Sequence, residues 1–361
     1  MPPVPEQPRT PTPQLPGDLF DTPRLYLREI APPRMNTALF LPMSRQTYAD
    51  TSFLDARTIP TDGRAFRVSL GAVLDRFQSE LPPLRATGFI FHTAFCGSTL
   101  LARALDKPGA SLAYKEPFLL HQLAEARRLG VPEAMPAPDG SAPELIRMAT
   151  ALLSRTFAPA EVPIVKVTDS CGNLARELLE AHPGSSGILL HFHLGDFIVA
   201  MLKRPRRRAY MRRMTGRAAI DLRNDPDLAS IKPDSLSDPQ AAAYVWLALM
   251  RQYIALLEDQ NLDVRSLDAR VFYENPAQTI AAAARLFGID ILDAEARSIA
   301  VGPVFTRDAK NPAKPFDARA KRRSLEQQRQ DLADEVAAGV AWSKRITAGR
   351  PIPDPLPRPL I

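Results

Sequence analysis

"FIFHTAFCGSTLLARAL", residues 89–105, joins a short apolar run to a compact break at Gly97 and then to a run rich in leucine. The apolar run predicts a buried strand, and the leucines repeat at the spacing of one helix face. A strand, a tight turn and a helix in this order are typical of loops that bind phosphate through backbone N–H groups. Such turns usually carry a lysine or an arginine, whereas this one carries Phe95. The open question is which group neutralises a bound phosphate.

The same order of strand and helix recurs along the chain. VPIVKVTD (162–169) precedes NLARELLEAH (173–182), and GILLHFH (187–193) precedes DFIVAMLK (196–203). Three such units predict an α/β fold, a three-layer P-loop-type domain whose central parallel sheet is flanked by helices. Ligands of such sheets bind beyond the carboxyl ends of the strands, which is where the turn at Gly97 is expected.

Composition divides the chain into three parts. Seven of the first sixteen residues are proline, so we expect residues 1–18 to form a disordered tail. Residues 19–84 contain two short apolar patches and one helix-like run at 66–77, and we interpret them as a structural lead segment. Residues 85–361 contain the alternating strands and helices and are assigned to the α/β domain.

Three helices are expected in the second half of that domain. SDPQAAAYVWLALMRQYIALLEDQ begins with Asp238 as its cap and Pro239 in its first turn. A second helix is expected from near Pro276 to near Gly288. A single long amphipathic helix over residues 317–346 is expected to end the domain.

Charge and composition limit the classes of function. The 361 residues carry a formal net charge of +6 with a pI of about 9.4, which favours an anionic ligand of nucleotide size but is too small to indicate nucleic acid. Cys96 and Cys171 form no CxxC pair or Cys/His cluster, so no disulfide framework and no metal site are predicted. The N-terminus has no signal-peptide core, and Arg251 and Gln252 interrupt the most apolar segment, 241–257. We expect a cytoplasmic protein without a membrane span.

Two common phosphate loops fit the turn poorly. A Walker A loop needs a glycine where His92 stands and a lysine where Ser98 stands. A cysteine phosphatase needs an arginine six residues after its cysteine, but Ala102 occupies that place and Arg103 follows it. A helix N-terminus lowers the pKa of a thiol, so a reactive Cys96 remains an alternative.

The turn resembles a third loop, that of the sulfotransferases. TAFCGSTLLARALD (93–106) is similar to their P-K/R-S-G-T-T/S loop, particularly in the bacterial type that continues into a Leu-Leu helix. YKEP (114–117) resembles the family's Lys-Glu segment, and VKVTD (165–169) resembles its lysine-containing strand. FYENPAQTIAAAARLFGI (272–289) resembles its Tyr-Glu-Asp-Leu segment and the helix that follows. The resemblance covers residues 87–320 and implies a member of the P-loop NTPase superfamily that uses 3′-phosphoadenosine 5′-phosphosulfate (PAPS).

The resemblance also implies which residues bind the donor. They are Phe95, Cys96, Gly97, Ser98 and Thr99 of the turn, His193, and Arg307, Lys310 and Lys314 of a late basic loop, for which a flexible charged connector is the alternative. Two positions depart from the family pattern. Phe95 replaces the basic residue that bridges the leaving phosphate and the sulfonate. His193 and Met201 stand where the family has the arginine and serine that bind the 3′-phosphate.

Three residues are candidates for catalysis. A sulfuryl acceptor must lose a proton, and the resemblance implies Glu116 as the general base, because the Glu of this segment serves as base in some members of the family; a surface turn is the alternative for its segment. Lys115 is expected to pair with Glu116 or with the sulfonate. A lysine inside an apolar strand needs a ligand or a carboxylate, so Lys166 contacts the donor or pairs internally with Asp169. We expect both lysines to converge on the pocket beside Ser98.

Several basic residues could replace the cation missing at position 95. The run KRPRRRAYMRRMTGR (203–217) is open to three interpretations, namely a solvated helix face, a site for a ligand or acidic substrate, and a contact to nucleic acid. His92 supplies a donor or cation to the turn, or is only packed and hydrogen-bonded. His191 and His193 carry the same two alternatives.

Three classes of function follow from these patterns. The first is a PAPS-dependent sulfotransferase acting on an alcohol, an amine or a glycan. The second is a transferase that uses another phosphorylated nucleotide donor. The third is a non-catalytic binding protein that keeps the fold without the key cation.

Overall fold

Five parallel strands form the central sheet, in the order β5-β6-β4-β7-β8. They are β4 (Gly88–His92), β5 (Ser111–Lys115), β6 (Val162–Lys166), β7 (Ser186–His191) and β8 (Asp263–Asp268). Every residue of β4, β5 and β7 is buried, as expected for a parallel sheet covered on both faces. The predicted α/β class, a central parallel sheet flanked by helices, is confirmed.

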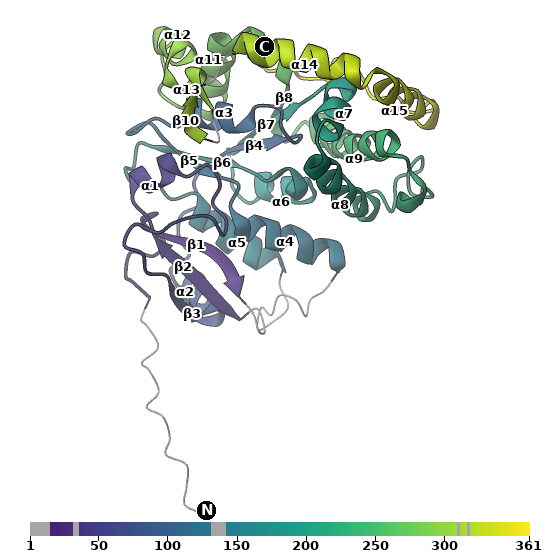
Figure 1. Ribbon diagram of the computed structural model, residues 1–361. Coiled ribbons are helices and arrows are strands. Elements are labelled where there is room, and N and C mark those ends of the chain that lie inside the picture. The colour runs from purple at the N-terminus through teal and green to yellow at the C-terminus, as the bar shows by residue number, and fades with distance from the viewer. Residues whose placement is uncertain (1–14, 32–35, 131–141, 309–310, 316–317) are drawn as a thin grey trace, which may run out of the picture.

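The computed structural model describes residues 15–31, 36–130, 142–308, 311–315 and 318–361. Figure 1 shows helices on both sides of the sheet. On one side lie α11 (Pro276–Phe287), α12 (Asp293–Val301) and α13 (Pro303–Thr306), and on the other lie α4 (Phe118–Leu129), α5 (Ala142–Leu153) and α6 (Ala175–Glu180). The group beyond β7 contains α7 (Leu194–Leu202), α8 (Pro205–Asp221) and α9 (Asp238–Glu258).

The predicted strand, turn and helix at residues 89–105 are present as β4, a tight turn and α3 (Ser98–Ala104). Strand β4 lies at the centre of the sheet, and the chain first adds β5 and β6 on one side and later β7 and β8 on the other. This reversal places a topological switch point at the carboxyl end of β4, where open α/β sheets bind ligands. The turn therefore lies at the position where a sheet of this kind binds its ligand.

The lead segment forms its own antiparallel sheet of β1 (Leu25–Ala31), β2 (Thr37–Pro42) and β3 (Phe66–Ser69), with α1 (Arg45–Asp50) and α2 (Leu70–Glu80). The helix-like run at 66–77 is helical only from Leu70, because its first four residues pair with β2. Residues 1–14 of the expected tail lie outside the described residues.

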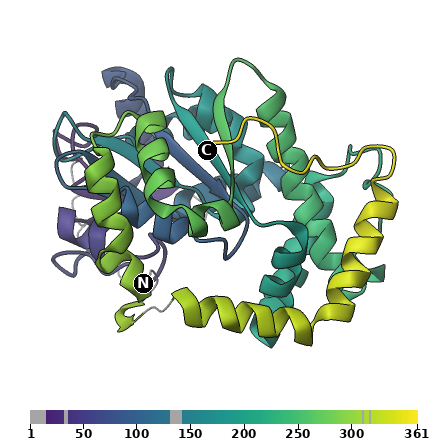
Figure 2. The same ribbon diagram turned by 90° about the horizontal axis from the view of Figure 1, so that it is seen from above.

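The single helix expected over 317–346 is wrong. The structure has two helices, α14 (Ala318–Asp331) and α15 (Ala333–Ile346), which meet at Leu332 and run in different directions in Figure 2. Packing decides the direction of α15, since Gly339 approaches α7 so closely that a Cβ there would lie 2.7 Å from Cδ1 of Ile198. The tail that follows α15 reaches the sheet edge, where Ser266 N–H donates to Arg358 O (2.9 Å) and Leu360 N–H donates to Ser266 O (2.8 Å).

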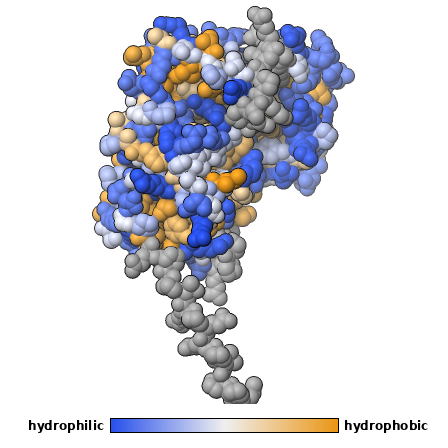
Figure 3. All heavy atoms as spheres, turned by 60° about the vertical axis from the view of Figure 1, so that its left-hand side comes forward, coloured by the Kyte–Doolittle hydropathy of each residue, from blue (hydrophilic) through white to orange (hydrophobic). Residues whose placement is uncertain are grey.

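The other two predicted helices are confirmed as α9 and α11. The cap of α9 is Ser237 rather than Asp238, and it forms a capping box with Gln240. A short antiparallel pair, β9 (Arg307–Asp308) and β10 (Asn311–Pro315), precedes α14. Figure 3 shows polar and apolar residues interspersed over the face that it draws. None of the described helices has both the length and the apolar character needed to cross a bilayer.

Candidate active site

A pocket of about 660 Å³ lies at the carboxyl end of β4. The turn and the first residues of α3 line it, together with Glu116, Asp169 and Phe192, which come after β5, β6 and β7. Further lining residues come from the start of α8, from residues 307–308 and from Arg57 of the lead segment. The pocket is therefore built at the switch point of the sheet, and its volume is within the ~300–1,000 Å³ range of small-molecule sites.

The turn depends on backbone conformations that few residues adopt. Gly97 has φ +100°, and a Cβ on it would lie 2.7 Å from the hydroxyl oxygen of Tyr273. Phe95 has φ 67°, also in the left-handed region. The first N–H groups of a helix have no acceptor within the helix, and the N-cap residue of α3, Gly97, has no side chain that could accept from them. Ser98 and Thr99 line the pocket, as expected for a phosphate cradle.

Gly97→Ala should destabilise the protein more than the equivalent change at Gly109. Both glycines have positive φ, but no atom lies within 4 Å of a Cβ at Gly109. Gly109→Ala should therefore cost about 1–2 kcal/mol from the backbone alone, and Gly97→Ala should cost more because Tyr273 must also move. Urea denaturation of both variants measures the difference. Tyr273→Phe should recover part of the loss in Gly97→Ala, and equal losses at the two glycines would contradict the close packing of the turn.

Cys96 points away from the pocket. Its side chain is buried, and its Sγ donates to Thr93 O at 2.8 Å. Burial raises the pKa of this thiol to about 12, against weaker opposing effects from its hydrogen bonds. Cys96 is not among the residues that line the pocket, so the structure does not place its thiol as a nucleophile there. Its contribution to a donor site is limited to the backbone of the turn.

Glu116 is not part of a surface turn. It has φ 53°, and its N–H donates to Lys166 O at 2.7 Å, which turns the side chain toward the pocket that it lines. The carboxylate accepts a hydrogen bond from Lys166 Nζ, and its Oε1 lies 3.7 Å from His92 Nε2. The side chain is 20% exposed, so it is held by fixed partners and remains open to the pocket.

Lys166 forms the internal ion pair, but its partner is Glu116 and not the expected Asp169. Asp169 instead accepts a hydrogen bond from the Tyr210 hydroxyl at 2.6 Å. Lys166 is fully buried, and its Nζ also lies 5.6 Å from the centre of the Phe53 ring. Lys166 therefore lies behind Glu116, where it orients the carboxylate.

Lys115 is not brought to the pocket, which corrects the expected convergence of the two lysines. Its Nζ donates to the carbonyl of Tyr48 at 2.5 Å and lies 3.6 Å from the carboxylate of Asp106. Burial lowers the pKa of Lys115 to about 8, and Asp106 opposes that shift. These partners hold the ammonium of Lys115 against α1, so its contacts stabilise the fold and do not face the pocket.

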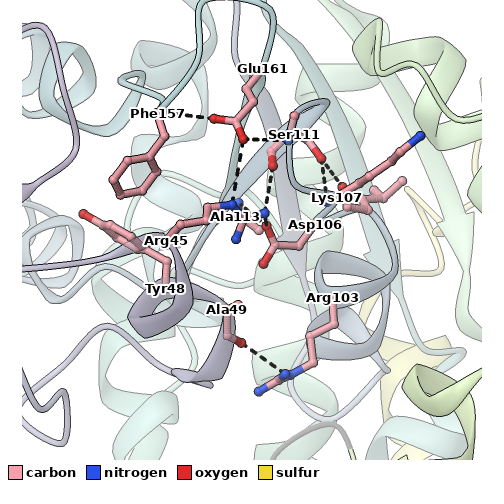
Figure 4. Close-up of polar contacts among 12 residues, drawn as sticks. Arg45, Tyr48, Ala49, Arg103, Asp106, Lys107, Ser111, Ala113, Phe157 and Glu161 are labelled. Carbon is pink, nitrogen blue, oxygen red and sulfur yellow. Dashed lines mark hydrogen bonds and ion pairs between the residues drawn. The ribbon is translucent and has the colours of Figure 1, made fainter. Parts of the chain in front are cut away.

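Figure 4 shows the polar network around Asp106. Its Oδ1 accepts from Arg45 Nη2 at 2.7 Å and from the Ala113 N–H at 3.2 Å. Arg45 also lies 3.8 Å from Glu161. The network joins α1 to β5 and to the segment before β6, and it fixes the lead segment against the central sheet.

His193 and Met201 also lie away from this pocket. His193 faces a second pocket of about 270 Å³, where its Nε2 lies 3.0 Å from Asp354 of the C-terminal tail. Met201 is 1% exposed and packs in the core. His191 is buried beside the second pocket, and burial lowers its pKa. The structure does not join these residues to the turn.

The late basic loop is described only in part. Arg307 is exposed and lines the pocket. Lys310 lies outside the described residues, and Lys314 belongs to β10 with its side chain outside the description. Arg307 is therefore the one member of this predicted set whose position can be reported.

The members of the basic run 203–217 differ in what surrounds them. Lys203 and Arg207 line the pocket. Three other arginines of the run form ion pairs with acidic side chains of other elements. They are Arg208, Arg212 and Arg217. The run is thus neither wholly a solvated face nor wholly a ligand site.

Among the lining residues to which sequence reasoning gave no role are Arg57, Tyr210 as a partner of Asp169, and Tyr273 behind Gly97. Arg57 lies in the lead segment, where no motif pointed to a ligand. Tyr210 and Tyr273 lie within stretches that were singled out for other residues. Among the described residues, no group of three His, Cys, Asp or Glu side chains is placed to hold a metal ion.

No protein-family model and no curated protein matches this chain. Among solved structures, it is similar to the sulfotransferase domain from the curacin biosynthetic pathway, with 14% identity over 70% of this chain and 98% of that chain and a TM-score of 0.41. It is also similar to a sulfotransferase from Alicyclobacillus acidocaldarius, with 13% identity over 73% of this chain and 96% of that one and a TM-score of 0.34.

Proposed function

We propose that this protein transfers a sulfuryl group from PAPS to a hydroxyl or amine acceptor. The observation that carries the proposal is the presence of a fixed carboxylate, Glu116, in the same pocket as the phosphate-type turn and several cationic side chains. The sequence resemblance at the turn and at residues 114–117 supports sulfuryl transfer as the reaction.

The donor set of the pocket fits the phosphosulfate end of PAPS. The backbone of the turn and the hydroxyls of Ser98 and Thr99 are hydrogen-bond donors, and Lys203, Arg207 and Arg307 add positive charge. Donors of this kind stabilise the charge that develops on a leaving phosphate, most strongly where water is excluded. We assign Lys203 and Arg307 of the pocket lining to a second phosphate, because His193 and Met201 lie elsewhere.

Glu116 is the proposed general base. When bound, PAPS supplies the sulfuryl group, and its sulfur–oxygen bond to the 5′-phosphate breaks as the acceptor oxygen or nitrogen attacks sulfur. The acceptor proton passes to the Glu116 carboxylate, and the bonding electron pair leaves with adenosine 3′,5′-bisphosphate. Lys166 orients this carboxylate from behind through their ion pair, which keeps one oxygen in place while the pocket side receives the proton.

A thermal-shift screen with PAPS, adenosine 3′,5′-bisphosphate, ATP and GTP tests the donor. A ligand at about 100 times its Kd stabilises the folded state by about 2.7 kcal/mol, so PAPS and adenosine 3′,5′-bisphosphate should raise Tm by several degrees while ATP and GTP should not. Stabilisation by ATP or GTP alone would contradict PAPS as the donor.

A transferase that uses another phosphorylated nucleotide is the second candidate. The observation in its favour is the position of His193 in the second pocket and of Met201 in the core, since neither is placed to bind a 3′-phosphate beside the turn. The same screen separates the candidates. No stabilisation by any of the four nucleotides would favour a non-catalytic binding protein.

A further inference from the structure

Arg207 lies over the turn that lacks a cation of its own. It belongs to the first turn of α8, and its guanidinium carbon is 3.8 Å from the centre of the Phe95 ring. Its Nη1 donates to Ala200 O at 2.9 Å, which fixes the guanidinium from the side of α7. The edge of the same Phe95 ring meets Tyr210, with 6.3 Å between the ring centres. Arg207 is therefore held by two neighbours, Phe95 and Ala200, and lines the pocket.

Among the residues that the structure describes, no acidic side chain balances the charge of Arg207. Its neighbours Arg208 and Arg212 bind Asp238, and Arg208 also binds Glu335. Within the described part of the chain, no carboxylate forms an ion pair with Arg207, and burial together with Arg204 lowers the pKa of Arg207 to about 10. A half-buried cation without an anionic partner is costly, and a bound anion would remove that cost.

The place of Arg207 in the first turn of α8 adds to the cost of its positive charge. Its first turn contains Arg206, Arg207 and Arg208 and no acidic residue. Positive charge at a helix N-terminus opposes the helix dipole, at a typical cost of about 0.3–1 kcal/mol for each charge. For two of the three arginines this cost is offset, because the charge of Arg208 is balanced by ion pairs and that of Arg206 is exposed to solvent. Arg207 forms no ion pair with a described carboxylate and is only partly exposed to solvent.

We propose that Arg207, held on the ring of Phe95, is the cation that binds the anionic group placed at the turn. The aromatic residue of the turn then acts as a platform for a charge supplied by α8. Phe95 is a positioning residue, because a guanidinium over an aromatic face is stabilised and kept flat against it. The identification of the anion as the phosphosulfate of PAPS rests on the proposed function, whereas the anion site itself does not.

Calorimetric titration with inorganic pyrophosphate and with adenosine 3′,5′-bisphosphate tests this assignment on the full-length protein. Arg207→Gln should raise the Kd of both probes roughly 10- to 100-fold, as expected for the loss of a charged hydrogen-bond donor. Phe95→Leu keeps the arginine but removes its platform, so it should weaken binding roughly 2- to 10-fold. Arg212→Gln is the matched control, since Arg212 lies on the same helix and binds Asp238 outside the pocket, and it should leave both Kd values unchanged.

A cation returned to the turn should compensate for the loss of Arg207. Phe95→Lys combined with Arg207→Gln should regain affinity relative to Arg207→Gln alone, which a merely structural arginine would not explain. The assignment is overturned if Arg207→Gln, shown by its Tm to be folded, binds pyrophosphate as tightly as the wild type, or if the added lysine restores nothing.

The two probes separate this assignment from the proposed function. Binding of pyrophosphate that depends on Arg207, without binding of adenosine 3′,5′-bisphosphate or PAPS, supports the anion site and contradicts PAPS as donor. Nucleotide binding that is unaffected by Arg207→Gln supports the function and overturns the role of Arg207. A wild-type protein that binds neither probe overturns both.

Discussion

Glu116→Gln should lower kcat about 10²- to 10⁴-fold, the usual contribution of a general base, and should leave the Kd of adenosine 3′,5′-bisphosphate nearly unchanged. The amide keeps the shape of the carboxylate but cannot take the acceptor proton. The reaction is followed as transfer of labelled sulfate from PAPS to the fastest acceptor in a panel of alcohols and amines. A fall in kcat without a change in donor binding is the signature of an interaction made in the transition state.

The control for Glu116→Gln is the same substitution at Glu125. Glu125 also forms ion pairs with basic side chains, here Arg128 and Arg217, but does not line the pocket. Glu125→Gln should leave kcat unchanged. Near-normal turnover in Glu116→Gln would remove Glu116 from the mechanism, and loss of donor binding with kcat retained would make it only the partner of Lys166.

Asp106→Ala should lower the free energy of unfolding by about 3–5 kcal/mol, because removal of one partner leaves buried charge without compensation. The Asp106 carboxylate is 5% exposed and contacts Arg45 at 2.7 Å and Lys115 at 3.6 Å. Urea denaturation measures the loss. The variant should lose stability without losing donor affinity once folded, since Asp106 does not line the pocket.

Two further variants show whether the buried charges cause this loss. The exposed pair of Arg285 and Asp293 is the matched control, and Asp293→Ala should cost at most ~1 kcal/mol. Lys115→Met in the Asp106→Ala background should recover stability, because it removes one of the uncompensated cations. If the two changes simply add, Lys115 and Asp106 are not coupled, and an uncompensated Lys115 is not the cause of the loss in Asp106→Ala.

Patterns between residues close in sequence were sufficient to predict the strand, turn and helix around Gly97 and the α/β class of the fold. The short buried strand, Gly97 and the leucines of α3 are close in sequence, and the left-handed φ at Gly97 is a property that glycine supplies by itself. Repetition of that unit was enough to predict a parallel sheet. The long helix expected at residues 317–346 was wrong because contacts of α15 with α7 and α9 override the continuous amphipathic pattern.

The site was less predictable because its side chains meet through packing across the fold. Lys115 and Lys166 stand opposite each other in the register of β5 and β6, yet α1 and Asp106 hold the first while Glu116 holds the second. The contact of Arg207 with Phe95 joins residues more than 100 positions apart and depends on how α8 lies against the turn. The sequence shows that Phe95 and the basic run exist, but it does not show that Arg207 contacts Phe95.

A crystal structure of the full-length protein with adenosine 3′,5′-bisphosphate is the most direct test of nucleotide binding at the switch point. The account predicts the 5′-phosphate against residues 95–99, within hydrogen-bond distance of Arg207, with Glu116 facing the open space beside it. A nucleotide bound in the second pocket near His193, or a 5′-phosphate turned away from the turn, would contradict it.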